Sequence, residues 1–341
     1  MEKGLNTRIK EITTWNQYKV VCDIPKNMLM ELTNCCNNTC LFCANSKSTK
    51  KRGFIETATA KKILKEAYDL GVREVGFYGG TGEPLLDNHL EEYISYAKDL
   101  GYEYTYITTN GALLNKERAN AIIKAGLDSI KLSINAVNRE MYQMIHGKDE
   151  FELVMDNLKY LHSLKQDTNN RFRLYVSYVA SRYTDVEQKE LEEVFGCYVD
   201  EIGYCKCNNV AGYMSEELRQ FLSVGNYLSF HPEGGICPLP FKTLYISYEG
   251  YLTMCCADFQ NYLVVADLKE EKLEDAWNNQ YARKLRERHI AHEIEGTRCF
   301  NCMNACNEQV MSLREEYAVL IKDKEWLKCD EIEKRINTMG K

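Results

Sequence analysis

Short apolar runs alternate with longer amphipathic segments from residue 28 to residue 204. The apolar runs have the length of buried strands, and the segments between them place apolar residues at helical spacing. Thr57 is a candidate N-cap for the first such helix, and Gly71 follows its end. The pattern predicts strands at residues 28–32, 74–78, 104–108, 129–134, 173–179 and 199–204, and helices at residues 57–70, 88–100, 116–125, 152–164 and 186–195.

This strand–helix repeat predicts an α/β fold with parallel strands and with helices packed outside them. Right-handed crossovers allow either an open doubly wound sheet or a barrel. In both, the loops after the carboxyl ends of the strands meet at one rim, where active sites form. A cysteine-rich loop follows the first strand, and a glycine-rich turn at residues 79–84 follows the second. The sequence therefore predicts a functional site at this rim.

The last third of the chain has a different pattern. Two short apolar runs, residues 243–247 and 251–255, flank a turn and predict a β-hairpin, and a helix is expected at residues 273–289. Together with the cysteines nearby, they predict a small cysteine-rich second module. The expected division is an N-terminal extension (1–27), a partial barrel (28–212), a linker (213–235), a cysteine-rich domain (236–310) and a C-terminal helical tail (311–341).

Composition narrows the class of protein. The chain has 341 residues and a net charge of −7, which argues against nucleic acid as a partner because phosphate binding needs clustered Lys and Arg. It contains no apolar stretch near the roughly 20 residues that span a bilayer, and no signal-peptide pattern at its start. We therefore expect a cytoplasmic protein with no membrane partner. In that reducing compartment, 15 cysteines indicate metal binding or catalysis rather than disulfides.

The first group of cysteines has the spacing Cys36-x3-Cys40-x2-Cys43, in the loop that leaves the first predicted strand. Iron–sulfur clusters are normally held by four cysteines, so three thiolates would leave one iron open to a substrate or cofactor. Two alternatives remain from spacing alone: a zinc knuckle, or a site closed by Cys35 as a fourth ligand.

This motif resembles that of the radical SAM superfamily, and further segments agree with it in order. Gly80-Thr81-Gly82-Glu83-Pro84 resembles the family's Gly-Gly-Glu-Pro element, with Thr81 where a glycine is common. The resemblance implies a partial (β/α)6 barrel and a 4Fe–4S cluster open to S-adenosylmethionine (SAM), which is cleaved to a 5′-deoxyadenosyl radical that abstracts hydrogen from a substrate. It implies SAM contacts by Thr81, Gly82, Glu83, Thr109, Asn110, Ser133 and Asn135, and Tyr178 is a further candidate at a strand end.

The later cysteines form a second constellation. The predicted hairpin would bring Cys237 and Cys255 together, and Cys299-x2-Cys302 would complete a four-cysteine site. Structural zinc has the same ligand set. The pattern nevertheless resembles the SPASM module and its shorter form, twitch, and is similar to the aminocyclitol dehydrogenase of the butirosin pathway. This resemblance implies one auxiliary 4Fe–4S cluster. Two cysteines, Cys306 and Cys329, are candidates for a second one, and Cys256 is expected to be a buried small side chain.

The reaction has two expected outcomes, oxidation or epimerisation of a sugar or aminocyclitol-type small molecule. Cys205 and Cys207 lie near the rim and are candidate catalytic thiols that could return hydrogen to a substrate radical. A peptide-modifying enzyme is the alternative, but residues 1–27 are too few for a leader-peptide recognition domain. An electron donor such as flavodoxin or ferredoxin is the expected protein partner. The alternative from another class is a zinc-stabilised binding protein without catalysis.

Overall fold

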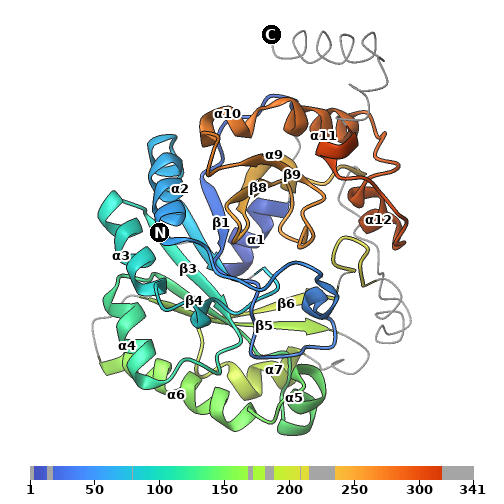
Figure 1. Cartoon of the computed structure of the whole chain (residues 1–341). Coiled ribbons are helices and arrows are strands. Elements are labelled where there is room, and N and C mark those ends of the chain that lie inside the picture. The colour runs from blue at the N-terminus through green and yellow to red at the C-terminus, as the bar shows by residue number, and fades with distance from the viewer. Residues whose placement is uncertain are drawn as a thin grey trace, which may run out of the picture.

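One continuous sheet organises the molecule. The computed structural model describes residues 4–13, 18–78, 80–167, 172–180, 188–207, 209–214 and 235–316. Within them, nine strands pair in the order β6-β5-β4-β3-β2-β1-β7-β8-β9 (Figure 1). The strands are β1 (Asn27–Glu31), β2 (Glu74–Tyr78), β3 (Tyr104–Thr109), β4 (Ser129–Ser133), β5 (Arg173–Ala180), β6 (Glu201–Lys206), β7 (Thr243–Ile246), β8 (Tyr251–Thr253) and β9 (Val264–Asp267).

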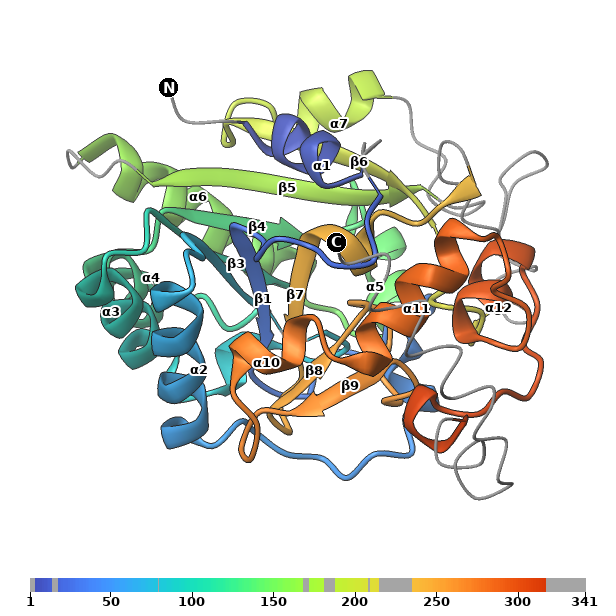
Figure 2. The same cartoon turned by 90° about the horizontal axis from the view of Figure 1, so that it is seen from above.

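The first six strands confirm the predicted fold class. Neighbouring strands from β1 to β6 are all parallel, and each is reached through a crossover from the strand before it. Seen from above, the sheet curves into a partial barrel (Figure 2). The predicted and observed strand boundaries differ by at most two residues, because the apolar run fixes the strand better than its ends.

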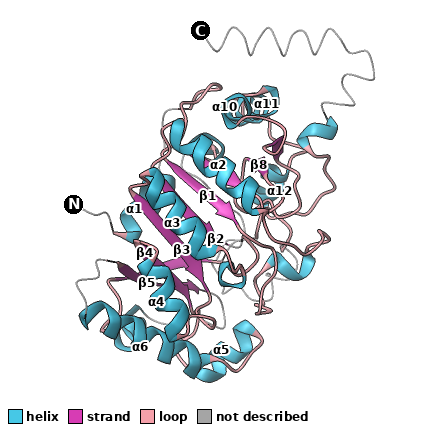
Figure 3. Cartoon of the chain, turned by 60° about the vertical axis from the view of Figure 1, so that its left-hand side comes forward, coloured by secondary structure: helices cyan, strands magenta, loops and turns pink. Residues whose placement is uncertain are grey.

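Four of the predicted helices, α2 (Thr57–Asp69), α3 (Leu90–Leu100), α4 (Lys116–Lys124) and α6 (Phe151–Asp167), cover the outer face of the sheet in a row (Figure 3). Local signals set their ends: the Asn115 side chain accepts a hydrogen bond from the Arg118 amide, and Gly101 ends α3 with a φ of 103°. The sequence analysis did not assign α5, which Asn138 caps and Gly147 ends. The barrel region also contains α5 (Arg139–His146) and α7 (Gln188–Phe195).

The predicted hairpin does not form a sheet of its own. Its first strand, β7, pairs in parallel with β1, and β8 and β9 then continue the same sheet with antiparallel pairing. The helix expected at residues 273–289 is instead two helices, α10 (Leu273–Trp277) and α11 (Gln280–Ile290). Two short helices, α9 (Leu239–Lys242) and α12 (Arg298–Asn304), complete the described part of this region. The predicted domain division therefore stays a prediction, since pairing of β7 with β1 crosses it.

The N-terminal segment contributes a helix, α1 (Leu5–Thr13), that reaches across the amino-terminal ends of the barrel strands. Leu5 packs on Gly203 of β6, and the Arg8 guanidinium pairs with Glu74 of β2 at 2.8 Å. The same guanidinium lies 3.8 Å from the ring centre of Tyr104. None of the helices in the described ranges is long and apolar enough to cross a bilayer. Most of the predicted linker, and residues 317–341 of the predicted tail, lie outside the described residues.

The break between α10 and α11 gives a stability prediction. The Asn279 side chain accepts hydrogen bonds from the amides of Tyr281 and Ala282, and so caps α11. Replacing Asn279 with alanine should lower the free energy of unfolding by about 1 kcal/mol, measured by urea denaturation. Gln280→Ala is the matched control, because this neighbouring side chain caps nothing. Equal losses in the two variants would contradict the assigned cap.

Candidate active site

The first candidate site is a cavity of about 230 Å³ at the carboxyl ends of the barrel strands. All three cysteines of the N-terminal motif line it, so the structure brings them together. Seven of the eight predicted SAM contacts line it as well; Tyr178 does not. The lining residues are Cys36, Asn38, Cys40, Phe42, Cys43, Tyr78, Gly80, Thr81, Gly82, Glu83, Thr108, Thr109, Asn110, Ser133, Asn135, His146 and Val179.

The cysteine loop is held from both sides. The end of α5 supports it, because the amides of Thr39 and Leu41 donate to the carbonyls of His146 and Ile145. On the other side, the Thr33 hydroxyl donates to the Gly53 carbonyl at 2.6 Å. These contacts hold the loop that carries the three thiols at the rim.

Burial raises the pKa of all three thiols. The pKa of Cys36 rises to about 11, and those of Cys40 and Cys43 also rise, with desolvation as the main cause. Thiolates this poorly solvated need a positive partner, and a metal that replaces the protons is the partner that a three-thiol loop provides for. The donor set therefore fits an iron–sulfur cluster with one open iron.

His146 is the last residue of α5 and lines the cavity, and it was not identified from the sequence. Its Nε2 lies 2.6 Å from the Ile134 carbonyl oxygen, so this nitrogen carries the proton. Its Nδ1 lies 3.2 Å from Cys40 Sγ and accepts from the thiol. Burial lowers the pKa of His146 to about 4, so the ring is neutral. A histidine thus contacts one of the three cysteines directly.

The glycine-rich turn lies against the cysteine loop. A Cβ on Gly82 would stand 2.3 Å from the Thr33 carbonyl oxygen and 2.6 Å from that of Cys35. The Glu83 amide donates to the same Cys35 carbonyl at 2.7 Å. Only glycine allows this approach, which places the turn beside the three thiols.

Glu83 already has partners in the structure. Its carboxylate accepts from the Thr109 hydroxyl at 2.7 Å and from the amides of Asn110 and Leu85 at 2.8 and 3.1 Å. Burial nevertheless raises its pKa to about 7. Glu83 therefore joins the loops after β2 and β3, and its predicted contact with the SAM amino group stays a prediction.

At and just after the ends of β4 and β5, the cavity is lined by Ser133, Asn135 and Val179. The hydroxyls of Ser133 and Ser177 lie 3.2 Å apart, and Asn135, with a φ of 54°, accepts from the Val179 amide at 3.0 Å. Tyr178, predicted as a cofactor contact, instead lies on the helix side, where its buried hydroxyl contacts Met141 Sδ at 3.4 Å. Alternation along β5 explains this, because neighbouring residues of a strand face opposite sides.

Two buried polar atoms at the cavity fit a bound cofactor. Thr81 Oγ1 and Asn38 Oδ1 are buried without a hydrogen-bond partner among the described residues, and both side chains line the cavity. Buried polar atoms are normally paired, so a polar ligand is expected to complete them. SAM, with its ribose hydroxyls and amino-acid groups, supplies such partners.

The second candidate site is a cavity of about 140 Å³ in the C-terminal region. The four predicted ligands Cys237, Cys255, Cys299 and Cys302 all line it. Four thiols at one cavity fit the usual ligand set of an iron–sulfur cluster, which structural zinc shares. Within the described residues, no group of three or more His, Cys, Asp or Glu is placed to hold a single metal ion.

Cys256 also lines the second cavity, and its side chain is exposed rather than buried as expected. Tyr245 forms a side-chain hydrogen bond to it. Cys207, a predicted catalytic thiol, is 5% exposed and packs in a small apolar cluster with Ala44 and Phe259. It lies outside both sets of cavity-lining residues, so its role stays a prediction.

Three other cysteine predictions remain untested. Cys205 is paired with Val179 in the β5–β6 ladder, but its side chain lies outside what the structure describes. Cys306 Sγ contacts Asn301 Oδ1 at 3.2 Å. Cys329 lies outside the described residues, so a second auxiliary cluster stays a prediction.

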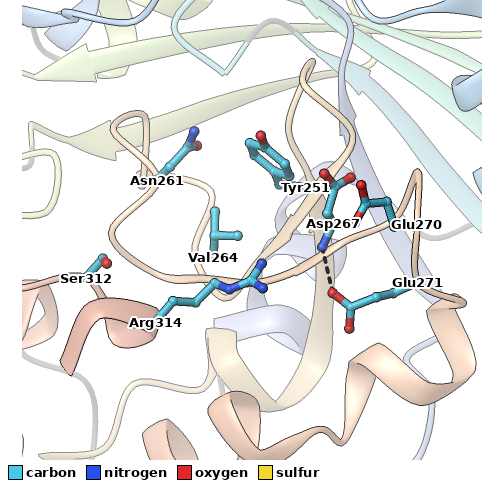
Figure 4. A pocket seen from close by; sticks show the side chains of 8 residues that line it. All are labelled: Tyr251, Asn261, Val264, Asp267, Glu270, Glu271, Ser312 and Arg314. Carbon is cyan, nitrogen blue, oxygen red and sulfur yellow. Dashed lines mark hydrogen bonds between the residues drawn. The ribbon is translucent and has the colours of Figure 1, made fainter. Parts of the chain in front are cut away.

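A third pocket, of about 310 Å³, lies outside β8 and β9 (Figure 4). Acidic side chains from β9 and the turn after it border it, and Arg314 extends into it from the segment after α12. The Asp267 amide donates to Glu271 Oε1 at 3.2 Å. None of its lining residues is a cysteine or a predicted site residue, so the candidate chemistry lies in the other two cavities.

Both cysteine sites match known protein families. Residues 30–180 match the model of the radical SAM superfamily, and residues 237–303 match that of the SPASM iron–sulfur cluster-binding domain. Among curated proteins, a probable GTP 3′,8-cyclase from Methanothermobacter thermautotrophicus is 33% identical over 132 residues, which is 39% of this chain and 42% of the relative. The match thus spans less than half the length of that relative.

Solved structures share the fold at low sequence identity. The Streptococcus suis protein SuiB, bound to its precursor peptide SuiA, has a TM-score of 0.62 and 16% identity, over 93% of this chain and 76% of its own. BtrN, in complex with AdoMet and 2-DOIA, has a TM-score of 0.56 and 18% identity, over 86% of this chain and 96% of its own. These similarities support the fold across both cysteine sites.

Proposed function

This chain is a radical SAM enzyme with a SPASM iron–sulfur cluster-binding domain, and on that premise we propose that it oxidises a sugar or aminocyclitol-type small molecule. Cys36, Cys40 and Cys43 would hold the SAM-binding cluster, and Cys237, Cys255, Cys299 and Cys302 the auxiliary one. Bound there, the clusters would supply reductive SAM cleavage at the first site and an electron acceptor at the second. The substrate would lose a hydrogen atom, then a proton to water and an electron to the acceptor.

The observation that carries the proposal is Tyr78, which lines the first cavity and interacts electrostatically with two cysteines of the second. Burial raises the pKa of Tyr78, and the charges of these cysteines, Cys255 and Cys256, add to the effect. Burial, and after it the charges of the same two cysteines, also raise the pKa of Tyr245. A phenol hydroxyl at the first cavity suits a small substrate that carries several hydroxyl or amino groups.

Epimerisation is the other outcome of the same chemistry, and Cys256 is the observation that favours it. Its exposed thiol stands beside Tyr245 at the edge of the second cavity, where it could return hydrogen to a substrate radical. Peptide modification is a further candidate, motivated by SuiB, whose structure contains a precursor peptide. The zinc-stabilised binding protein is not retained, since both cysteine motifs fall within iron–sulfur family models.

The test is a turnover assay in heavy water with anaerobically reconstituted protein, SAM, dithionite and a panel of aminocyclitols and sugars. Oxidation is expected to give one 5′-deoxyadenosine per ketone formed, with no deuterium at a non-exchangeable carbon. Deuterium at such a carbon would establish epimerisation instead. Release of 5′-deoxyadenosine that depends only on peptides would contradict the small-molecule proposal.

A further inference from the structure

Arg298 is a buried cation at the auxiliary site that the sequence analysis did not single out. It is the first residue of α12, next to the predicted ligand Cys299, and is only 3% exposed. No carboxylate forms an ion pair with it among the described residues. Its guanidinium lies 3.6 Å from the ring centre of Tyr213, and its Nη2 donates to the Ala211 carbonyl at 2.9 Å. A charge buried without a counter-ion is costly unless a negative group completes it.

One nitrogen of this guanidinium has no partner. Both Nη atoms donate to Asn307 Oδ1, at 3.1 and 3.2 Å, but Nε is buried without an acceptor among the described residues. The Arg298 side chain lines the 140 Å³ cavity together with the four predicted cluster ligands. The unsatisfied donor and the uncompensated charge therefore belong to the same side chain at the same cavity.

The loop that Arg298 holds is strained. Val210 and Ala211 both have a positive φ, 47° and 54°, which is unfavourable for residues other than glycine and most of all for a β-branched one. This conformation lets the Ala211 amide hydrogen-bond to the Cys302 thiol, while the Ala211 carbonyl accepts from Arg298. Strained backbone persists where its surroundings enforce it, and here it aims a donor at a predicted ligand.

We propose that Arg298 is a positioning residue of the auxiliary cluster, whose Nε donates to a cluster sulfur and whose charge raises the cluster's reduction potential. Four thiolates around a 4Fe–4S core carry net negative charge, so they supply the counter-ion that the buried guanidinium lacks. Hydrogen bonds to the sulfurs and nearby net charge are among the main determinants of such potentials. A higher potential would make this cluster a better acceptor for the electron of an oxidised substrate. The inference depends on the auxiliary cluster but not on the identity of the substrate.

The test measures the auxiliary cluster alone. In a background with Cys36, Cys40 and Cys43 changed to alanine, Arg298→Met and Arg298→Lys are reconstituted and titrated with dithionite under EPR. Arg298→Met should lower the reduction potential of the cluster by about 59 mV relative to the parent. For a one-electron couple, this is a tenfold shift of the equilibrium toward the oxidised cluster. Arg298→Lys keeps the charge and should recover most of this shift.

Lys269→Met is the control. Lys269 is in the same module, but it is paired with Asp267 at 3.0 Å and is more exposed, so its removal should leave the potential unchanged. An unchanged potential in Arg298→Met, or equal shifts in the Met and Lys variants, would overturn the proposal. If Met alone fails to retain iron, a native potential in Lys supports the role of the charge. If both Arg298 variants lose iron while circular dichroism shows a native fold, the proposal is overturned, and Arg298 instead serves to retain the cluster.

Discussion

Replacing Cys36, Cys40 and Cys43 together with alanine is expected to abolish release of 5′-deoxyadenosine from SAM while the auxiliary iron is retained. The three thiols line one cavity, and no other cysteine lines it. Without them the SAM-cleaving cluster has no protein ligands, so no residual pathway is available. The rate should fall to background, a loss on the order of 10⁶-fold or more if the whole acceleration is removed. Chromatography of dithionite-reduced reactions and iron analysis measure the two expectations.

Cys35→Ala is the matched control for this prediction. Cys35 adjoins the motif, and as a fourth ligand it would close the cluster against SAM. It does not line the cavity, and its carbonyl oxygen instead accepts from the Glu83 amide. The Cys35 variant should therefore retain SAM cleavage and its iron. Loss of both in this variant, or continued cleavage by the triple variant, would show that the ligands are assigned wrongly.

The barrel could be predicted from the sequence because its signals are local. Each apolar run has the length of a strand, and each segment between them has apolar residues at helical spacing. The sequence therefore predicts β1 to β6 and five helices, and most of the predicted ends lie within two residues of the observed ones. α5 was missed although Asn138 and Gly147 mark its two ends, because it is only eight residues long and follows directly on the loop after β4. α1 was missed because it is short and precedes the repeat.

Long-range contacts could not be predicted in the same way. The pairing of β7 with β1 joins segments more than two hundred residues apart, and no local pattern encodes it. The prediction of a single helix at residues 273–289 was wrong because a local signal was overlooked. Its apolar spacing continues through Asn278 and Asn279, whereas the side chain of Asn279 starts a new helix.

The candidate site shows the same division. The spacing of the cysteines and the order of the motifs along the chain predicted three cysteines and seven SAM contacts that line the first cavity. This was possible because the ends of parallel strands lie at the same rim. Tyr178, predicted from its place at a strand end, does not line the cavity, since such a place does not say which way the side chain points. Arg298 and His146 were missed because their roles depend on burial and on contacts with distant residues.

Gly82→Ala is expected to lower the rate of SAM cleavage by about 100-fold or more with little change in global stability. The new Cβ would stand 2.3 Å from the Thr33 carbonyl oxygen and 2.6 Å from that of Cys35. Both neighbours are backbone atoms in the cysteine loop, so relief requires the loop or the turn to move. A displacement near 1 Å can cost 10²-fold in rate when reacting groups must align. Single-turnover formation of 5′-deoxyadenosine measures this loss.

The matched control is Gly296→Ala, at a glycine with a φ of 76° and no atom within 4 Å of the added Cβ. That change imposes left-handed strain of about 1 kcal/mol without a clash, and it should leave SAM cleavage unchanged. EPR of the reduced cluster separates misalignment from loss of iron. Gly82→Ala should retain the cluster signal but lose the change that SAM binding produces in the parent. A normal SAM-induced change and a normal rate would mean that the turn tolerates displacement, and that close contact with the cysteine loop does not position the cofactor.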